Sequence, residues 1–460
     1  LLVLLVVVAA VLWQNQSHGI AGADRSGYMN LARMLSRGER TLPIPHRCDG
    51  CEPYWFTPLG FVPAPDGVHM SSFYPTGLPL QLLVTKSVSP ICGVLLVFLT
   101  FLLGRRLHSE VAGFIAALFM ALCAVFVFES LQIMSDVPAA MWSVAAVLAA
   151  MWGGLQPAMW GGLQPAVGGG LQPAEVERAE ARSTWLHYVS GFCFGVAVLV
   201  RPTSLLLLPV LCVCLGRLKP ALRFALGGVP CAVFLGWYNL GAFGSVLSTG
   251  YAAAGATQEF AWAYFPARAV HYLKWTVVQF SVIGCIAALW GMRRRVLLAV
   301  WLVPFFLFYS FYFSYNEWWY TRFLLPAYPA LAVAAGIAFA ELKWRRVAIA
   351  AVIVIAAWQL RQIARFGVLH TDEEQSRAMA PVHWAAQHLP PRALVFSHEY
   401  SGTLLHESSL KPVRFDLAPP GRPLADYAVL MEQEIAPFLA RHPRFRRLHT
   451  EEDGAVFVRQ

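Results

Sequence analysis

Charged residues are scarce in this chain of 460 residues, where Asp, Glu, Lys and Arg together make up only 13%. Hydrophobic residues make up 57%. Soluble globular domains carry roughly twice that charged fraction, so the composition excludes an ordinary soluble protein and predicts a multi-span membrane protein. The net charge of +9 arises mostly from basic loops between the apolar runs, and we infer no nucleic-acid partner from it.

Long apolar runs recur along most of the chain. A membrane core about 30 Å thick needs about 20 apolar residues per helix, and by that measure we expect about eleven spans in a lipid bilayer. The first is short and the sequence does not begin with Met, so we expect residues before Leu1; a cleaved signal peptide is the alternative. The expected spans are 1–13, 90–106, 110–128, 135–152, 184–200, 202–217, 222–240, 270–291, 296–313, 322–341 and 346–361.

Basic residues in the short connections set the orientation, because cytoplasmic loops are enriched in Lys and Arg. A cytoplasmic N-terminus places all of these connections inside and leaves 14–89 outside as one long loop. We therefore expect a membrane domain over 1–365 and a soluble extracytoplasmic domain over 366–460, in a bacterial-type plasma membrane. The basic connections contain Arg105, Arg106, Arg217, Lys219, Arg223, Arg293, Arg294, Arg295, Lys343, Arg345 and Arg346.

Two motifs have simple interpretations. Three nearly identical octads lie within 151–183 and indicate a recent duplication in a cytoplasmic insert without chemistry. Cys48 and Cys51 form a single CxxC pair in the external loop. A zinc site normally shows a second pair of ligands, so we expect a small disulfide or two free thiols there, and no metal.

The first external loop opens with a helical pattern after Asp24. Tyr28, Leu31 and Leu35 recur at helical spacing and Gly38 is a natural stop, which predicts a helix lying on the membrane surface. From residue type alone, Asp24 is best interpreted as the N-cap of this helix. The apolar run after Tyr74 is too short to cross, and we expect it to dip into the outer leaflet.

Arg201 is followed at once by Pro202 and stands between two apolar runs. A guanidinium keeps its charge and is costly at membrane depth, so we expect Arg201 at an interface or in a polar cavity, facing an anion. Asp136 stands at the mouth of another span and, taken alone, is equally explained as a helix cap. The predicted topology puts Arg201 and Asp136 on the external side together with Asp24, His271, Lys274, Glu317 and Arg322. Such a surface suits the anionic head group of a lipid.

In their order and sidedness, several segments resemble the C-type (GT-C) glycosyltransferase superfamily, in particular family 39 with its protein O-mannosyltransferase and aminoarabinose transferase branch. The resemblance covers most of the membrane part. The sequence departs from it at Arg25, where many relatives carry a second acidic residue, and this speaks against a two-carboxylate metal site. The matching segments are Asp24 with Ala32–Gly38, Tyr74–Leu80, Ser135–Asp136, Val200–Thr203, Tyr238–Ser245, Thr249–Tyr251 and Tyr320–Pro329.

The resemblance implies the α-helical polytopic GT-C fold and transfer of a sugar from a polyprenyl-phosphate donor to an acceptor protein, lipid or glycan outside the membrane. By position, Asp24 matches the family's catalytic aspartate, a general base on the acceptor hydroxyl, and Asp136 matches its second acidic position. Direct displacement would invert the anomeric centre. A divalent metal is compatible with this chemistry but not required, and we expect no other cofactor.

The remaining site residues are expected around the leaving group and the sugar. Cations stabilise the charge that builds up on a departing lipid phosphate. We expect donor-phosphate binding by Arg201, Arg322 and Lys274, and substrate binding by Tyr74, Glu317 and Tyr320.

Other interpretations stay open. Arg322 can anchor to phospholipid head groups, Tyr320 can belong to an aromatic interface belt, and Glu317 can pair with a nearby arginine. A second function class is a secondary transporter or flippase for an anionic lipid-linked substrate, and a third is a membrane scaffold with an external sensing domain. Transporters usually show two related halves with substrate groups near the midplane, a pattern this sequence does not show.

Polar residues return after residue 365. Strand-like runs at 393–397, 427–430 and 455–459, with a helix at 432–441, predict a small C-terminal α/β domain. His398, Glu399 and His406 do not form a recognisable metal spacing. We expect this domain to bind acceptor or to cover the site, without chemistry of its own.

Overall fold

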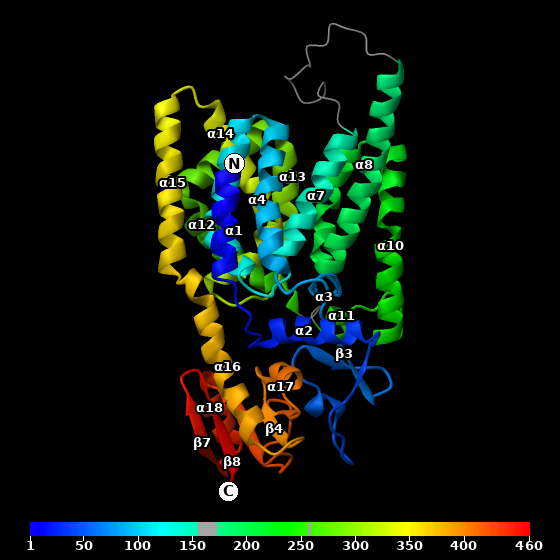
Figure 1. The fold of residues 1–460 in the computed structure, drawn as a ribbon, viewed down its shortest axis with the longest axis vertical. Coiled ribbons are helices and arrows are strands. Elements are labelled where there is room, and N and C mark those ends of the chain that lie inside the picture. Colours follow the sequence, from blue (N-terminus) through cyan, green and yellow to red (C-terminus); the bar gives the residue numbers. More distant parts are fainter. Residues whose placement is uncertain (155–172, 256–258) are drawn as a thin grey trace.

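The computed structural model describes residues 1–154, 173–255 and 259–460. A bundle of long helices occupies one end of the molecule and a small domain with a mixed sheet occupies the other (Figure 1). The helix α2 (Ala23–Ser36) lies crosswise between them. Most of the octad insert predicted over 151–183 falls outside the described residues.

The bundle consists of apolar helices that run roughly along the long axis of the molecule in Figure 1. They are α1 (Leu2–Gln14), α4 (Val88–Leu107), α5 (Glu110–Ala121), α6 (Ala124–Ser130), α7 (Asp136–Gly154), α8 (Pro173–Val200), α9 (Leu208–Leu215), α10 (Leu218–Phe243), α12 (Phe265–Arg294), α13 (Val296–Ser310), α14 (Tyr328–Glu341) and α15 (Arg345–Arg365).

Each interval in which we expected a span contains such a helix. Within the described residues, six helices are long and apolar enough to cross a membrane, and the pair α5 and α6, bent by 64°, makes a seventh candidate. Four further apolar helices have 10–17 residues. The chain is an integral multi-pass membrane protein, and the count of about eleven spans stays a prediction.

Small residues allow the central helices to approach closely. A Cβ added at Gly336 of α14 would lie 2.3 Å from the carbonyl oxygen of Ala112 in α5, and one at Gly291 of α12 would lie 1.9 Å from that of Ala334. Close backbone contact through glycine and alanine is the usual way in which membrane helices associate. Helix α14 is accordingly buried, whereas α10 lies at the edge of the bundle with mostly exposed apolar side chains.

Residues 14–89, predicted from the sequence to be the first external loop, form a layer under the bundle in Figure 1. It contains α2, α3 (Gly77–Leu82), the short 3-10 helix η1 (Pro53–Phe56) and an antiparallel sheet of strand order β1-β3-β2. The strands are β1 (Leu42–Pro43), β2 (Phe61–Pro63) and β3 (His69–Ser72). Cys48 and Cys51 form a disulfide, one of the two states that the sequence left open.

The C-terminal domain is built on a five-stranded sheet of order β5-β4-β6-β8-β7, in which β4 pairs in parallel with both β5 and β6. The predicted strands near 393–397, 427–430 and 455–459 and the helix at 432–441 are confirmed, whereas α16, α17, β5 and β7 were not anticipated. The elements are α16 (Thr371–His388), β4 (Leu394–Ser397), α17 (Ser401–Glu407), β5 (Lys411–Arg414), β6 (Tyr427–Met431), α18 (Glu432–Arg441), β7 (Phe445–Glu451) and β8 (Gly454–Arg459).

Helix α17 of this domain packs directly on α2. The side-chain amide of Asn30 donates a hydrogen bond of 2.9 Å to the carbonyl oxygen of Gly402. A Cβ at Gly402 would lie 2.4 Å from the Ser26 hydroxyl oxygen and 3.1 Å from the Leu59 carbonyl oxygen, so a larger residue would require the contact to shift. The C-terminal domain thereby helps to fix the helix that carries Asp24.

Candidate functional site

Asp24 lies inside the first turn of α2, whose N-cap is Gly22 at φ 91°. Its carboxylate accepts two hydrogen bonds from distant parts of the chain, 2.7 Å from the Tyr74 hydroxyl to Oδ1 and 2.9 Å from the Arg322 guanidinium to Oδ2. No side-chain cap is formed at Gly22. The interpretation of Asp24 as an N-cap was therefore wrong, because its side chain points to other elements and away from the helix's own amides.

The partners of Asp24 decide its charge. Burial raises the pKa of Asp24, but the Arg322 guanidinium and the Tyr74 hydroxyl outweigh it and hold the pKa below the ordinary value of 3.8. Burial, reinforced by the neighbouring Asp24 carboxylate, raises the pKa of Tyr74 well above its ordinary value. At neutral pH the pair is thus a carboxylate and a neutral hydroxyl donor. The Asp24 side chain is still 37% exposed, which leaves it accessible to a reactant.

Asp136 and Arg201 form a second ion pair. Asp136 opens α7 with a side chain only 1% exposed, and it pairs with a guanidinium that is 11% exposed. Arg201 follows the last residue of α8, and Pro202 begins the 3-10 helix η3 (Pro202–Leu207), so the backbone turns away and leaves the arginine at the helix end. Its Nε donates to the Tyr309 hydroxyl at 3.3 Å.

Aromatic residues connect the two ion pairs. The Phe323 ring lies 5.1 Å from the guanidinium carbon of Arg201 and 5.5 Å from that of Arg322. The Tyr28 ring packs 4.7 Å from the Tyr74 ring, and the Tyr28 hydroxyl donates to Ser135, the neighbour of Asp136, at 2.9 Å. We call Asp24, Asp136, Arg201 and Arg322 the arginine–aspartate site. It joins α2, α7, the end of α8 and the 3-10 helix η6 (Trp318–Ala327).

Glu129 is an acidic residue beside this site to which sequence reasoning gave no role. Its side chain is 1% exposed, and neither carboxylate oxygen has a hydrogen-bond partner within the described residues. The buried Nε atoms of Arg25 and Arg322 also lack partners there. Unpaired buried polar groups cost about 1–3 kcal/mol each, so such a group calls for water or a ligand. The available signal was a lone carboxylate at the end of the apolar run 124–128.

The other predicted site residues fall into two groups. Tyr74 contacts Asp24 directly, and Tyr320 lies under Arg322, with 5.7 Å from the guanidinium carbon to the ring centre. Lys274 is exposed and lies 4.9 Å from the ring of its neighbour Trp275. Glu317 is exposed at the N-cap of η6 and forms no ion pair with any residue that the structure describes. The structure therefore brings Tyr74 and Tyr320 to the arginine–aspartate site but neither Lys274 nor Glu317.

The carboxylates of the site are paired with guanidinium groups. Across the described ranges, no group of three or more His, Cys, Asp or Glu side chains is arranged to hold a metal ion. Whether a divalent metal takes part stays as the sequence left it, compatible but not required.

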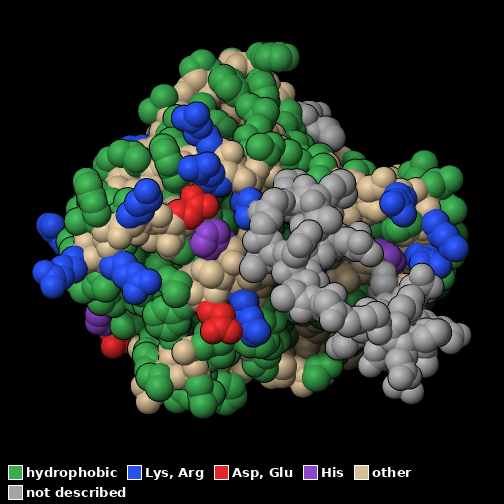
Figure 2. All heavy atoms as spheres, turned by 90° about the horizontal axis from the view of Figure 1, so that it is seen from above, with side chains coloured by type: hydrophobic (Ala, Val, Ile, Leu, Met, Phe, Trp, Pro, Cys, Tyr) green, Lys and Arg blue, Asp and Glu red, His purple; other side chains and the backbone are tan. Residues whose placement is uncertain are grey.

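The end that faces away from the C-terminal domain carries more basic than acidic side chains among its apolar ones (Figure 2). Cytoplasmic ends of membrane proteins show this excess. The arginine–aspartate site lies at the opposite end, where α2 separates the bundle from the C-terminal domain.

No family model and no curated protein matches this chain. Several solved structures match it. ArnT from Cupriavidus metallidurans in the apo state aligns over 99% of this chain and 97% of its own, with a TM-score of 0.61 and 15% identity. The same protein bound to undecaprenyl phosphate aligns over the same shares, with a TM-score of 0.58 and 14% identity. The apo oligosaccharyltransferase from Archaeoglobus fulgidus aligns over 94% of this chain and 70% of its own, with a TM-score of 0.57 and 13% identity.

At this identity the likeness establishes the fold. The chain has the α-helical polytopic fold of the C-type glycosyltransferase superfamily, with a small C-terminal α/β domain. This confirms the fold class that the sequence resemblance implied.

Proposed function

We propose that this protein is a membrane glycosyltransferase that moves a sugar from a polyprenyl-phosphate donor to an acceptor hydroxyl on the external face of the membrane. The observation that supports it most directly is the arginine–aspartate site, in which two guanidinium groups and two carboxylates meet at one end of the bundle. ArnT is solved with undecaprenyl phosphate, and the archaeal oligosaccharyltransferase AglB with a dolichol-phosphate and an inhibitory peptide. Polyprenyl phosphates thus bind to proteins of this fold.

Arg201 and Arg322 bind the phosphate of the donor in this proposal. A polyprenyl-phosphate sugar carries its negative charge on the phosphate, and that charge grows when the sugar departs. Both guanidinium groups lie within 5.5 Å of one ring, that of Phe323, and are therefore near enough to each other to act on one phosphate. Asp136 is fully buried against Arg201 and holds its guanidinium in place, so its proposed role is to position the arginine.

Donor binding would also release the base. In the structure Asp24 Oδ2 is occupied by Arg322, whereas Tyr74 holds Oδ1. A phosphate that draws Arg322 toward itself leaves Oδ2 free to accept a proton from the acceptor hydroxyl, while Tyr74 keeps the carboxylate oriented. Phosphate and Asp24 thus compete for one guanidinium, and the base becomes available when the donor is present.

The reaction is then a single displacement. The acceptor oxygen forms a bond to the anomeric carbon as the bond from that carbon to the phosphate oxygen breaks. Asp24 takes the acceptor's proton, and polyprenyl phosphate leaves with the bonding electron pair, its charge met by Arg201 and Arg322. Attack from the face opposite the phosphate inverts the anomeric centre.

A transporter or flippase for the same lipid is the competing function. It would move the donor across the membrane without breaking it. Purified protein in neutral nanodiscs, supplied with a radiolabelled polyprenyl-phosphate sugar and a mixture of candidate acceptors, separates the two functions. We expect the release of free polyprenyl phosphate and the appearance of label on an acceptor. The control variant Arg293→Ala, which changes an exposed arginine in the last turn of α12, should release the same amount. Intact donor after full incubation with every acceptor class would refute the proposal.

A further inference from the structure

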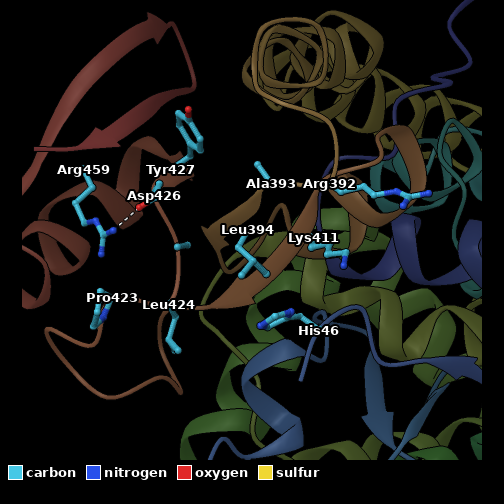
Figure 3. Close-up of a pocket in the computed structure, with 11 residues that line it drawn as sticks. His46, Arg392, Ala393, Leu394, Lys411, Pro423, Leu424, Asp426, Tyr427 and Arg459 are labelled. Carbon is cyan, nitrogen blue, oxygen red and sulfur yellow. Dashed lines mark hydrogen bonds and ion pairs between the residues drawn. The ribbon is translucent and has the colours of Figure 1, made fainter. Parts of the chain in front are cut away.

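A pocket of about 380 Å³ beside the C-terminal sheet has no converging set of polar groups. Its carboxylate, Asp426, is paired with Arg459, and the side chains of Lys411 and Arg392 run away from the open space (Figure 3). None of the residues that line it, all of them described, has a buried side-chain nitrogen or oxygen without a hydrogen-bond partner. The surroundings of Glu129 differ in this respect.

Glu129 stands one residue before the end of α6, beside the arginine–aspartate site. Its neighbour Phe128 packs with its ring 5.2 Å from that of Trp318, which holds this end of α6 against η6. The charged side chains that act on Glu129 come from α2, α7 and η6. They are those of Asp136, Arg322, Arg25 and Asp24.

These surroundings favour the neutral acid form of Glu129. The side chain is 1% exposed, and within the described residues no donor reaches either of its oxygens. An ionised carboxylate buried without donors costs far more than a neutral acid that lacks one hydrogen bond. The neighbouring carboxylates of Asp24 and Asp136 would also repel a negative charge on Glu129. Glu129 is therefore held as a carboxylic acid.

Arg25 is consequently left without a paired carboxylate. Its guanidinium donates to the Ala21 carbonyl oxygen at 3.1 Å, and its buried Nε has no partner in the part of the chain that the structure describes. The adjacent Asp24 is occupied by Arg322. Glu374 of α16 also acts on Arg25, but it is exposed, so solvent and salt screen its charge.

The charges of the site can now be counted. Arg201 is paired with Asp136 and Arg322 with Asp24, so Arg25 adds one uncompensated positive charge. We propose that Glu129, as a neutral acid, preserves this charge, and that a singly charged phosphodiester bound at Arg201 and Arg322 completes it. Glu129 is thus a positioning residue, which acts through charge without touching the phosphate. That the phosphodiester is the sugar donor rests on the proposed function, whereas binding of the anion does not.

The same count holds through the transfer. With donor bound, three guanidinium groups face two carboxylates and one phosphodiester charge. After the displacement, Asp24 is neutral because it holds the acceptor's proton, and the released phosphate carries two charges. The site is balanced in both states. An ionised Glu129 would add a negative charge to each state and would repel the phosphate.

The pH dependence of anion binding tests this proposal. The probe is a fluorescent farnesyl methyl phosphate, a phosphodiester whose single charge does not change between pH 6.5 and 9.5. Its Kd is measured on the full protein in phosphatidylcholine nanodiscs at constant ionic strength. As Glu129 loses its proton at alkaline pH, the Kd of the wild type should rise about tenfold through repulsion between nearby charges. Glu129→Gln is neutral at every pH and should bind as the wild type does at pH 6.5, with an unchanged Kd at pH 9.5.

Variants of Arg25 test the source of the positive charge. Arg25→Gln should raise the Kd about tenfold already at pH 6.5, because the phosphodiester then has no uncompensated charge to meet. Arg25→Lys keeps the charge and should bind within about twofold of the wild type. A merely structural role of Arg25 would not distinguish these two variants by charge.

His398 provides the control for other titrating groups. Burial lowers the pKa of His398, but Glu434 and Asp416 outweigh it and raise the pKa above 6.5. Loss of its positive charge therefore falls in the same pH range and would also weaken anion binding. His398→Gln should keep the alkaline weakening if Glu129 is its source.

Three outcomes would overturn the proposal: a Kd of the wild type that is independent of pH, an alkaline weakening that persists in Glu129→Gln, or wild-type binding by Arg25→Gln. If Glu129→Gln does not fold, Glu129→Met, also uncharged and similar in volume, takes its place. Sugar transfer together with an alkaline weakening that persists in Glu129→Gln would refute this inference and leave the proposed function intact. Phosphodiester binding that follows these variants without any transfer would do the reverse.

Discussion

Arg322 and Asp24 are 298 residues apart in the sequence and 2.9 Å apart in the folded chain. The contact joins η6, at the start of a long apolar helix, to α2, which lies crosswise at the end of the bundle. It makes the carboxylate of Asp24 share a guanidinium with any anion that enters the site. The proposed coupling between donor binding and release of the base follows from this sharing.

Asp24→Asn is expected to abolish most transfer while donor binding persists. The amide cannot accept the acceptor's proton, and general-base contributions amount to about 10²–10⁴-fold in rate. Single-turnover transfer and donor affinity should be measured on the same nanodisc preparation. Because the substitution also frees Arg322 from its carboxylate partner, donor affinity should stay equal or rise. Full transfer activity in this variant would remove Asp24 from the proposed role.

Arg201→Ala is expected to weaken donor binding and to destabilise the protein. It leaves Asp136 buried without a partner, which costs about 3–5 kcal/mol for a pair as buried as this one. The double variant Arg201→Ala with Asp136→Asn should recover most of the thermal stability but not the donor affinity, which separates the two effects. Thermal unfolding and binding of the labelled donor check this.

Lys274→Ala is the matched comparison for Arg201. The sequence grouped both residues as phosphate ligands, but Lys274 is exposed beside Trp275. We expect its donor affinity within about twofold of wild type, a free-energy change of roughly 0.4 kcal/mol. If donor affinity were lost with Lys274→Ala and kept with Arg201→Ala, the phosphate would have to bind elsewhere.

Tyr74→Phe is expected to shift the pH profile of transfer. The Tyr74 hydroxyl is one of the groups that hold the pKa of Asp24 below 3.8 in the folded protein. Its removal raises the pKa of Asp24, so the acid limb of the pH profile of kcat/KM should move to higher pH. At a pH well above this limb, kcat/KM should fall less than it does on the limb itself. Tyr28→Phe provides the control, because the Tyr28 hydroxyl donates to Ser135. An acid limb that moves equally in both variants would argue against the hydrogen bond as its cause.

The C-terminal domain should lose stability as pH rises from acid to neutral. Burial lowers the pKa of His398, but its hydrogen bond to Glu434 and the Asp416 carboxylate outweigh this and raise the pKa above 6.5. The folded state therefore binds this proton more tightly than the unfolded chain. The gain is fully present below pH 6.5 and disappears as pH rises through the folded-state pKa. Hydrogen exchange of β4 amides from pH 5.5 to 8.5 measures it, after correction for the intrinsic exchange rate.

His398→Gln is the comparison for that measurement. Without the titrating ring, the opening free energy of β4 should lose this part of its pH dependence. An unchanged pH dependence in His398→Gln would place the effect on other groups.

The sequence by itself determined the membrane class, the positions of the apolar helices and the presence of a helix beside Asp24. These depend on local composition and helical periodicity, which each segment carries alone. Strands at 393–397, 427–430 and 455–459 were predictable for the same reason. By contrast, the helices α16 and α17 and the edge strands β5 and β7 were missed. Strand β5 contains Pro412 between charged ends and β7 is mostly exposed, so neither shows a strand's apolar pattern.

Only the tertiary structure decided which charges meet. From the sequence we interpreted Asp24 as a helix cap, because the helix that follows it was the nearest partner. In the structure its hydrogen-bond donors are Arg322 and Tyr74, which lie 298 and 50 residues away in the chain. The sequence grouped Lys274 and Arg201 together as phosphate ligands, but only Arg201 lies at a helix end that faces a buried carboxylate. The burial of Glu129 without a hydrogen-bond partner among the described residues likewise depends on the packing of distant segments. A charged residue in an apolar run indicates that it needs a partner, because an unpaired charge is costly there. Which residue becomes that partner depends on how the chain packs.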